Sequence, residues 1–211
     1  MKKISIIFLV VLLLISCTPK QPLQAELETA KKLMETNGDV PADTTKALKY
    51  FKTAAMGGNS EAMYYMGYLN QYGIGLARNA DAAIEWYLRS AQAGYPKAQN
   101  KMGMIYYTGN GAEKDYADAL NWFTKSAKQD YDQAQYMLGK VYSIGRGVEP
   151  DTAKAIKWLK KAVAGGHPYP EFLLGKLLYE TGNPEEAYEW VKKSADKGVG
   201  HAKELLEKID N

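Results

Sequence analysis

The sequence predicts an all-α fold, a solenoid of stacked helix pairs that ends in a C-terminal capping helix. Three observations predict it. A block of 36 residues recurs, with starts at Ala62, Ala98 and Ala134. The apolar residues inside each block follow helical spacing, so that Ala83 and Trp86 lie on one stripe of a helix. One helix pair cannot bury such a stripe alone, and neighbouring pairs must therefore stack around a shared core.

The predicted elements follow one another in blocks. An opening half-block over 44–59 supplies one helix, and full blocks over 62–97, 98–133 and 134–169 each supply an A helix and a B helix. A fourth block over 170–201 has a shorter turn, and a last helix from Gly200 to Ile209 caps the array. This gives about ten helices in all. One column of the B helices is aromatic throughout: Tyr50, Trp86, Trp122, Trp158 and Trp190.

Polar residues and glycines mark the predicted helix ends. Seven residues before the aromatic column stand types that cap helix N-termini: Asp43, Asn79, Asp115, Asp151 and Asn183. Eight residues after it stand helix-ending glycines: Gly58, Gly94, Gly166 and Gly198. Asp130 takes that position in the second full block. A left-handed conformation there would cost Asp130 about a few tenths of a kcal/mol.

Two further sets of glycines recur within the blocks. One set lies on the A helices and should let neighbouring helices approach closely: Gly67, Gly103, Gly139 and Gly175. The other set forms pairs in the loop between A and B helices: Gly73/Gly75, Gly109/Gly111 and Gly145/Gly147. These pairs relieve strain in a tight loop. They do not continue to the third glycine of a dinucleotide-binding fingerprint.

The N-terminus has the layout of a secretory signal peptide. Two lysines precede an apolar run from Ile4 to Ile15, which is too short to span a bilayer, and small Ser16 precedes Cys17. Cys17 is the only cysteine, so it cannot form a disulfide within the chain. An ordinary signal peptide that happens to carry a cysteine is the alternative interpretation.

The stretch Leu14-Ile15-Ser16-Cys17 resembles the bacterial lipobox. The resemblance implies cleavage before Cys17, diacylation of its thiol by fatty acids such as palmitate, and acylation of the new amine. Thr18 in place of aspartate implies delivery to the outer membrane, with the protein facing the periplasm or the cell surface. The predicted domains are therefore a signal peptide over 1–16, an acylated tether over 17–23 and a solenoid over 24–211. An extended tether of this length reaches only about 20 Å.

The recurring pattern A-x-x-x-[ML]-G-x-x-Y-x-x-G-x-G, followed by D-x-x-x-A-x-x-W, resembles the Sel-one-like repeat, a relative of the tetratricopeptide repeat. The resemblance covers about residues 44–200. It implies a right-handed α/α solenoid whose A helices line a concave, protein-binding side. Asn70 departs from the tyrosine found at Tyr106 and Tyr142, and we expect looser packing around it.

Residues of the A helices that are not needed for the core are the candidate partner-binding residues. They form an aromatic track interrupted by lysines, and tyrosine is favoured at interfaces because it offers both apolar area and a hydroxyl. The candidates are Tyr64, Tyr68, Tyr72, Asn100, Met104, Tyr107, Tyr136, Lys140, Ile144, Phe172, Lys176 and Tyr179. The alternative for Tyr64 and Tyr136 is packing between helices.

The composition offers little to an enzyme or a nucleic-acid-binding protein. Loss of Lys2 and Lys3 with the signal peptide leaves a net charge near +1, unlike the strongly basic face that nucleic acid requires. The two histidines, His167 and His201, fit loop or surface positions. Ser194 begins an S-x-x-K stretch, but the companion motifs of serine β-lactamases are absent from the sequence. We expect no catalytic or metal site, no cofactor, no small-molecule substrate and a monomer.

These observations predict a membrane-anchored interaction module that binds a protein partner. Within the family that it resembles, such lipoproteins act as scaffolds, in host interaction, or as periplasmic immunity proteins that block a secreted toxin such as a lipase. A purely architectural part of an envelope complex is a further alternative. A β-lactamase-like periplasmic hydrolase is the alternative that the sequence disfavours.

Overall fold

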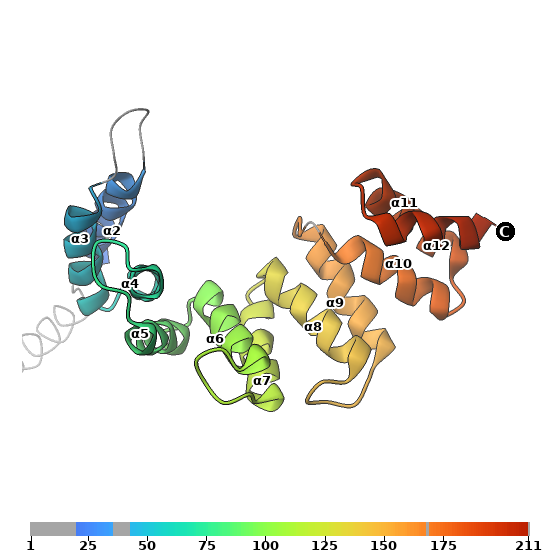
Figure 1. Cartoon of the computed structure of the whole chain (residues 1–211), viewed down its shortest axis with the longest axis horizontal. Coiled ribbons are helices and arrows are strands. Elements are labelled where there is room, and N and C mark those ends of the chain that lie inside the picture. Colours follow the sequence, from blue (N-terminus) through green and yellow to red (C-terminus); the bar gives the residue numbers. More distant parts are fainter. Residues whose placement is uncertain (1–19, 36–42, 168, 211) are drawn as a thin grey trace, which may run out of the picture. The chain divides into compact units, whose positions relative to one another are not determined.

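The computed structural model describes residues 20–35, 43–167 and 169–210, and all regular elements in these ranges are α-helices (Figure 1). The chain divides between Ala83 and Ile84 into two compact units. Cys17, the signal peptide predicted over 1–16 and the first residues of the predicted tether lie outside the described residues. The predicted all-α solenoid of helix pairs is confirmed.

Consecutive helices pack on one another from Lys20 to Tyr72 in unit 1 and from Pro96 to Asp210 in unit 2. Unit 1 holds α2 (Lys20–Met34), α3 (Thr44–Met56), α4 (Ser60–Tyr72) and the first residues of α5 (Ala80–Gln92). Unit 2 holds the rest of α5, then α6 (Pro96–Thr108), α7 (Tyr116–Ala127), α8 (Asp132–Ile144), α9 (Thr152–Ala164), α10 (Pro170–Glu180), α11 (Pro184–Asp196) and α12 (Gly200–Asp210). The even-numbered helices are the A helices, and α12 is the predicted cap.

The helix α2 was not among the predicted elements. It completes the opening block, which is therefore a helix pair and not a half-block. Its sequence lacks the repeat signature, because Glu26 and Lys31 stand where Ala62 and Gly67 stand one block later. The helix is nevertheless docked, since Leu27 and Ala30 are fully buried. Residues 20–23, predicted as part of an extended tether, belong to this helix.

Four of the five predicted N-caps are confirmed. The side-chain oxygens of these residues accept a hydrogen bond from the backbone N–H three positions later, at 2.8–3.0 Å: Asp43, Asn79, Asp115 and Asp151. Asn183 occupies the N-cap position but does not cap with its side chain. Its Nδ2 instead donates to Thr181 O and Thr181 Oγ1, both at 3.3 Å. Pro184 follows at the first helical position, where its fixed φ favours the helix.

The aromatic column is offset by one residue from the centre of the core. The four tryptophans are only half-buried, whereas the residue after each of them is almost fully buried. This inner column is Phe51, Tyr87, Phe123, Leu159 and Val191, each at most 2% exposed. The buried stripe of α5 is therefore Ala83, Tyr87 and Ala91. The prediction that this stripe runs through Trp86 is wrong, because Tyr87 takes the buried position and Trp86 is only half-buried.

The A-helix glycines of unit 2 lie against this inner column, as their predicted role in close helix approach requires. A Cβ atom added at Gly103 would lie 2.6 Å from the Phe123 ring, and one added at Gly139 would lie 2.5 Å from Leu159 Cγ. Real Cβ atoms do not approach other heavy atoms this closely. In unit 2, Gly103, Gly139 and Gly175 thus each make room for one large side chain of the next B helix.

The predicted looseness around Asn70 is wrong. Asn70 is only 6% exposed, and its Nδ2 donates to Met66 O at 2.8 Å. The backbone carbonyl of Asn70 also accepts a hydrogen bond from Asn79 N at 2.9 Å. The shorter side chain is therefore bonded within its own helix, and the backbone carbonyl of Asn70 is bonded by the following loop.

Asp130, which follows α7 in place of a helix-ending glycine, is left-handed, with φ at +56°. Its equivalents Gly58, Gly94, Gly166 and Gly198 have φ between +86° and +96°. We expect Asp130→Gly to raise the free energy of unfolding by up to about 1 kcal/mol, because glycine adopts this conformation without strain. The gain is reduced by loss of the bond from Gln135 Nε2 to Asp130 Oδ1, 3.2 Å long.

Urea denaturation of the two proteins measures this difference. Gly94→Ala is the matched control, because it places a Cβ at the equivalent left-handed position and has open space around it. It should destabilise by about 1 kcal/mol. A less stable Asp130→Gly protein would show that the side-chain bond outweighs backbone strain.

Candidate partner-binding face

The predicted binding residues of unit 1 lie on α4, and two of them are exposed. Tyr68 is 38% exposed and Tyr72 is 57% exposed, with their ring centroids 4.7 Å apart. They are one helical turn apart, which brings the rings together. Tyr64 is half-buried and meets Tyr65 edge to face at 5.9 Å. The exposed part of this set is thus a pair of neighbouring tyrosines.

In unit 2 the exposed members of the predicted set lie on α8 and α10. Ile144 is 51% exposed and occupies the position of Tyr72 two blocks later. Tyr179 is 37% exposed, and the Lys176 side chain is 50% exposed and lies 3.7 Å from Glu180. Apolar and aromatic side chains thus reach solvent from A helices in both units.

Other members of the predicted set support the core. Met104, Tyr107 and Tyr136 pack against the cluster built around Phe123 and Leu138. Phe172 packs against the C-terminal cluster of Val191, Ala195 and Ala202. The alternative of packing is therefore the better description of Tyr136 in the absence of a partner.

Asn100 is the predicted binding residue that the structure removes from the surface. It is 5% exposed, its Nδ2 donates to Gln133 Oε1 at 3.2 Å, and its Oδ1 is buried without a hydrogen-bond partner. Its side chain turns toward α8, because the amide finds a partner there. Asn100 therefore offers almost no exposed surface to a partner in this structure.

A cationic side chain lies over the ring of each of two predicted binding residues, Tyr107 and Tyr136. Arg146 Nη1 donates to the Tyr107 hydroxyl at 3.0 Å, and the guanidinium lies over the rings of Tyr107 and Tyr116. Arg146 comes from the glycine-paired loop between α8 and α9, and it was not predicted. Lys140 lies 5.7 Å from the Tyr136 ring centroid. Burial raises the pKa of Tyr136.

Two further hydrophobic residues are exposed but were missed, Met56 at 70% and Tyr169 at 68%. Met56 is the last residue of α3 and lies on a B helix. Tyr169 lies between α9 and α10, directly before Pro170, which stands where Ala62, Ala98 and Ala134 stand in the earlier blocks. That departure was the available signal for Tyr169, because residues outside a repeat column are not fixed by the packing of the repeat.

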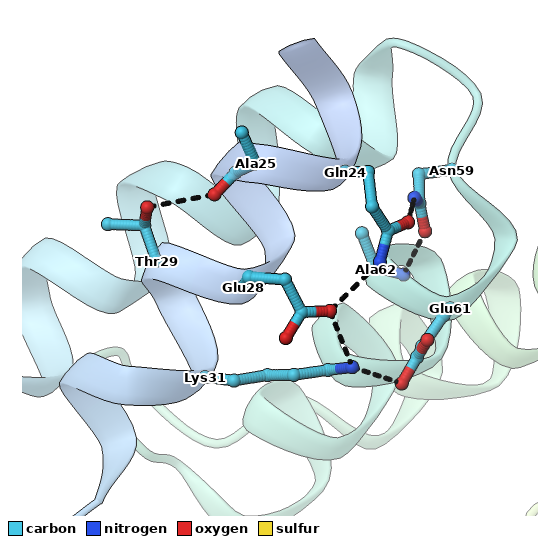
Figure 2. Close-up of polar contacts among 8 residues, drawn as sticks. All are labelled: Gln24, Ala25, Glu28, Thr29, Lys31, Asn59, Glu61 and Ala62. Carbon is cyan, nitrogen blue, oxygen red and sulfur yellow. Dashed lines mark hydrogen bonds and ion pairs between the residues drawn. The ribbon is translucent and has the colours of Figure 1, made fainter. Parts of the chain in front are cut away.

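Side-chain contacts join α2 to α4 in unit 1 (Figure 2). Lys31 Nζ lies 2.7 Å from Glu61 Oε1 and 3.3 Å from Glu28 Oε1, and Asn59 Nδ2 donates to Gln24 Oε1 at 3.4 Å. Burial by itself would lower the pKa of Lys31, but the bonds and charges of Glu61 and Glu28 outweigh it, and the pKa is raised. These contacts replace the small-residue packing that α2 lacks, and they keep Lys31 charged.

The stretch from Ser194 to Lys197 is built into the repeat. Ser194 is 2% exposed, and the equivalent Ser126 donates its hydroxyl to Pro96 O at 2.7 Å. Lys197 is held by the carboxylate of Glu171. Ser194 is therefore a buried helix residue without access to a substrate.

Within the described ranges, His, Cys, Asp and Glu side chains do not gather in groups of three that could hold a metal ion. In the same part of the chain, none of the helices has the length and apolarity needed to cross a bilayer.

The Sel1 repeat family model matches residues 24–59, 60–95, 96–131, 132–167 and 171–199. The first match includes α2 and α3, in agreement with the complete opening pair. No curated protein sequence matches the chain significantly.

Solved structures share the fold. A protective antigen of uropathogenic Escherichia coli that displays an SLR fold is 31% identical, with a TM-score of 0.79 over 89% of this chain and 41% of that one. This chain thus spans about two fifths of the antigen's length. A Sel1 repeat protein from Oxalobacter formigenes is 28% identical, with a TM-score of 0.76 over 86% of this chain and 72% of that one.

An immunity protein from Pseudomonas aeruginosa is 17% identical, with a TM-score of 0.54 over 88% of this chain and 68% of that one. At that identity the likeness concerns the fold alone. The five consecutive matches extend over most of the chain, from residue 24 to residue 199. The chain therefore belongs to the Sel1 repeat family.

Proposed function

We propose that this protein is a lipid-anchored interaction scaffold that binds a protein partner through the exposed side chains of its A helices. One observation carries the proposal. The described residues expose six large hydrophobic side chains, and four of them belong to the set that the repeat alignment predicted: Tyr68, Tyr72, Ile144 and Tyr179. Exposed aromatic and apolar residues gathered on one kind of element are typical of protein-binding surfaces.

The proposed anchor is the acylated thiol of Cys17, at the outer membrane and facing the periplasm. Its support is the lipobox-like stretch that ends at Cys17 and the threonine that follows it. Because α2 begins at Lys20, a chain attached to lipid at Cys17 holds this helix within about 10 Å of the bilayer. The scaffold would therefore meet its partner close to the membrane.

The proposal predicts that Tyr68→Ser combined with Tyr72→Ser lowers partner binding at least about tenfold, because two interface tyrosines supply well over 1 kcal/mol. A photo-crosslinking amino acid at position 72 of the full chain identifies the partner in intact cells. The same group at position 56 is the matched control, since Met56 is even more exposed but lies on a B helix. The position-72 product should be absent from the control.

Undiminished binding by the tyrosine variant would contradict the proposed face, provided that its thermal unfolding is unchanged. Little change in unfolding is expected, because neither side chain belongs to the buried core.

The identity of the crosslinked partner separates the more specific roles. A secreted lipase or another toxin would make the protein an immunity factor, and a permanent envelope subunit would make it an architectural part. A periplasmic hydrolase is disfavoured by the burial of Ser194.

A further inference from the structure

His167 lies in the turn between α9 and α10 and joins this turn to α8. Its side chain is buried, at 8% exposed. The imidazole stacks on the Tyr136 ring of α8, with centroids 4.6 Å apart and planes at 25°, and Tyr169 meets it edge to face at 5.8 Å. The backbone N–H of Tyr169 donates to His167 Nδ1 at 3.3 Å. One imidazole therefore links α8, the turn and the start of α10.

This arrangement requires a neutral imidazole. Nδ1 can accept the Tyr169 N–H only when it carries no proton, so the single ring proton belongs on Nε2. Protonation would make both ring nitrogens donors. The Nδ1–H group would then face the backbone N–H of Tyr169, and a charge would lie in a buried site. The geometry thus stabilises one protonation state of His167 over the other.

The charged groups near the ring do not reverse this preference. Asp132 of α8 and Glu171 of α10 are the carboxylates that act on His167, and Glu171 is already bound to Lys197. Lys140 lies over the same tyrosine on which His167 stacks. Burial lowers the pKa of His167, and the two carboxylates offset this only in part.

The equivalent positions of the neighbouring blocks hold no group that titrates in the mildly acidic range. Tyr95 and Tyr131 occupy the equivalent sites, and Asn59 does so in unit 1. Histidine is the side chain whose ordinary pKa places its charge change in the mildly acidic range. The α9–α10 turn therefore differs from the equivalent turns in its response to acid.

We propose that His167 is an acid-sensitive lock that holds the start of α10 against α8, and that its protonation loosens the part of the proposed partner-binding face that α8 and α10 carry. The second half of this proposal rests on the proposed function. The first half concerns the fold alone. The structural consequence of acid should appear at the Tyr169 amide, whose hydrogen bond is lost, and at the first turn of α10.

The sign of the effect follows from proton binding. A histidine with a lowered pKa in the folded state binds fewer protons there than in the opened state, so acid favours opening. The lock is fully effective above the ordinary histidine pKa of about 6.5 and weakens as the pH falls below it. At about pH 5.5 the equilibrium constant for opening should rise by up to about tenfold relative to about pH 7.5.

Amide hydrogen exchange of the purified mature chain, corrected for the intrinsic pH dependence of exchange, measures this at Tyr169. His167→Asn is the matched variant, because its Oδ1 can accept the same N–H but does not titrate. His167→Tyr is a second variant and restores the residue of the neighbouring blocks. Wild-type protection should fall by up to about tenfold between about pH 7.5 and about pH 5.5, and that of either variant by less than about twofold.

Imidazole NMR signals give an independent measurement, and His201→Gln assigns them because the chain has only two histidines. A His167 signal that titrates above the ordinary histidine range, or equal acid sensitivity in wild type and His167→Asn, would overturn the lock. Acid-dependent exchange combined with acid-independent partner binding would retain the lock and remove its regulatory role. Acid-dependent exchange without any crosslinked partner would retain the lock and contradict the proposed function.

Discussion

Phe123→Ala is expected to lower the free energy of unfolding of unit 2 by about 3–5 kcal/mol. Phe123 is fully buried and belongs to the cluster that joins α7 to α8. Removing its ring deletes apolar contacts and leaves a cavity that the rigid helices around it can close only in part. Urea denaturation followed by tryptophan fluorescence measures the loss. Amide exchange at α6 and α8 shows whether it is confined to the neighbouring helix pairs, as expected for a repeat protein.

The contact between Phe123 and Gly103 makes a sharper prediction. Gly103→Ala alone should destabilise the protein by about 1–3 kcal/mol, because the new Cβ would lie 2.6 Å from the ring. In the Phe123→Ala background the same change should be neutral or stabilise by up to about 1 kcal/mol, because alanine favours the helix and the clash is gone. The two changes should therefore not add. Additive effects would show that Gly103 does not serve to admit this ring.

Trp122→Ala is the control that shows which of the two adjacent residues, Trp122 or Phe123, faces the core. Trp122 is larger than Phe123 but only half-buried, with Lys125 over its ring at 4.3 Å. Trp122→Ala should accordingly cost less than Phe123→Ala. The opposite order would place the tryptophan column at the centre of the core and contradict the inner column described above.

The features that could be predicted from the sequence are those in which one residue type has one physical role. Asp151 can cap a helix through a single short side chain, and Gly103 can admit a large neighbour only because it has no Cβ, so both roles follow from position in the repeat. The burial of the tryptophan column could not be predicted in this way. Trp122 and Phe123 are adjacent and both apolar, and helical spacing alone does not distinguish a stripe at i+3 from one at i+4. Their degrees of burial settle the register.

The exposure of some candidate binding residues, but not of all, could be predicted from their positions in the repeat. Tyr72 and Ile144 are exposed as the alignment predicted, because residues opposite the glycine column must leave the core. Asn100 was placed wrongly, since its direction depends on Gln133 from the next block. The helix α2 escaped notice because ion pairs such as Lys31–Glu61 replace the expected small residues. The role of His167 depends on Tyr136 and Tyr169, whose rings come together only in the fold.

Cys17→Ser is expected to abolish attachment to the membrane. Serine offers no thiol for acylation, and the chain would then lack the acyl chains. Each methylene of such a chain contributes about 0.8 kcal/mol of membrane affinity when it is buried in the bilayer. Fractionation of cells should move nearly all of the protein out of the washed envelope, and labelled palmitate should no longer be incorporated. Wild-type protein should carry the label and stay with the envelope.

A second substitution beside the anchor separates attachment from sorting. Thr18→Asp leaves the thiol in place, so palmitate labelling should persist, but the lipobox resemblance implies that aspartate after the cysteine retains the protein in the inner membrane. Density separation of the two membranes shows the shift. Wild-type protein that incorporates no label would favour an ordinary signal peptide, because Cys17 would then be a residue near the cut without a lipid. In that case α2 would not be held close to a bilayer, and the binding face would meet its partner in free solution.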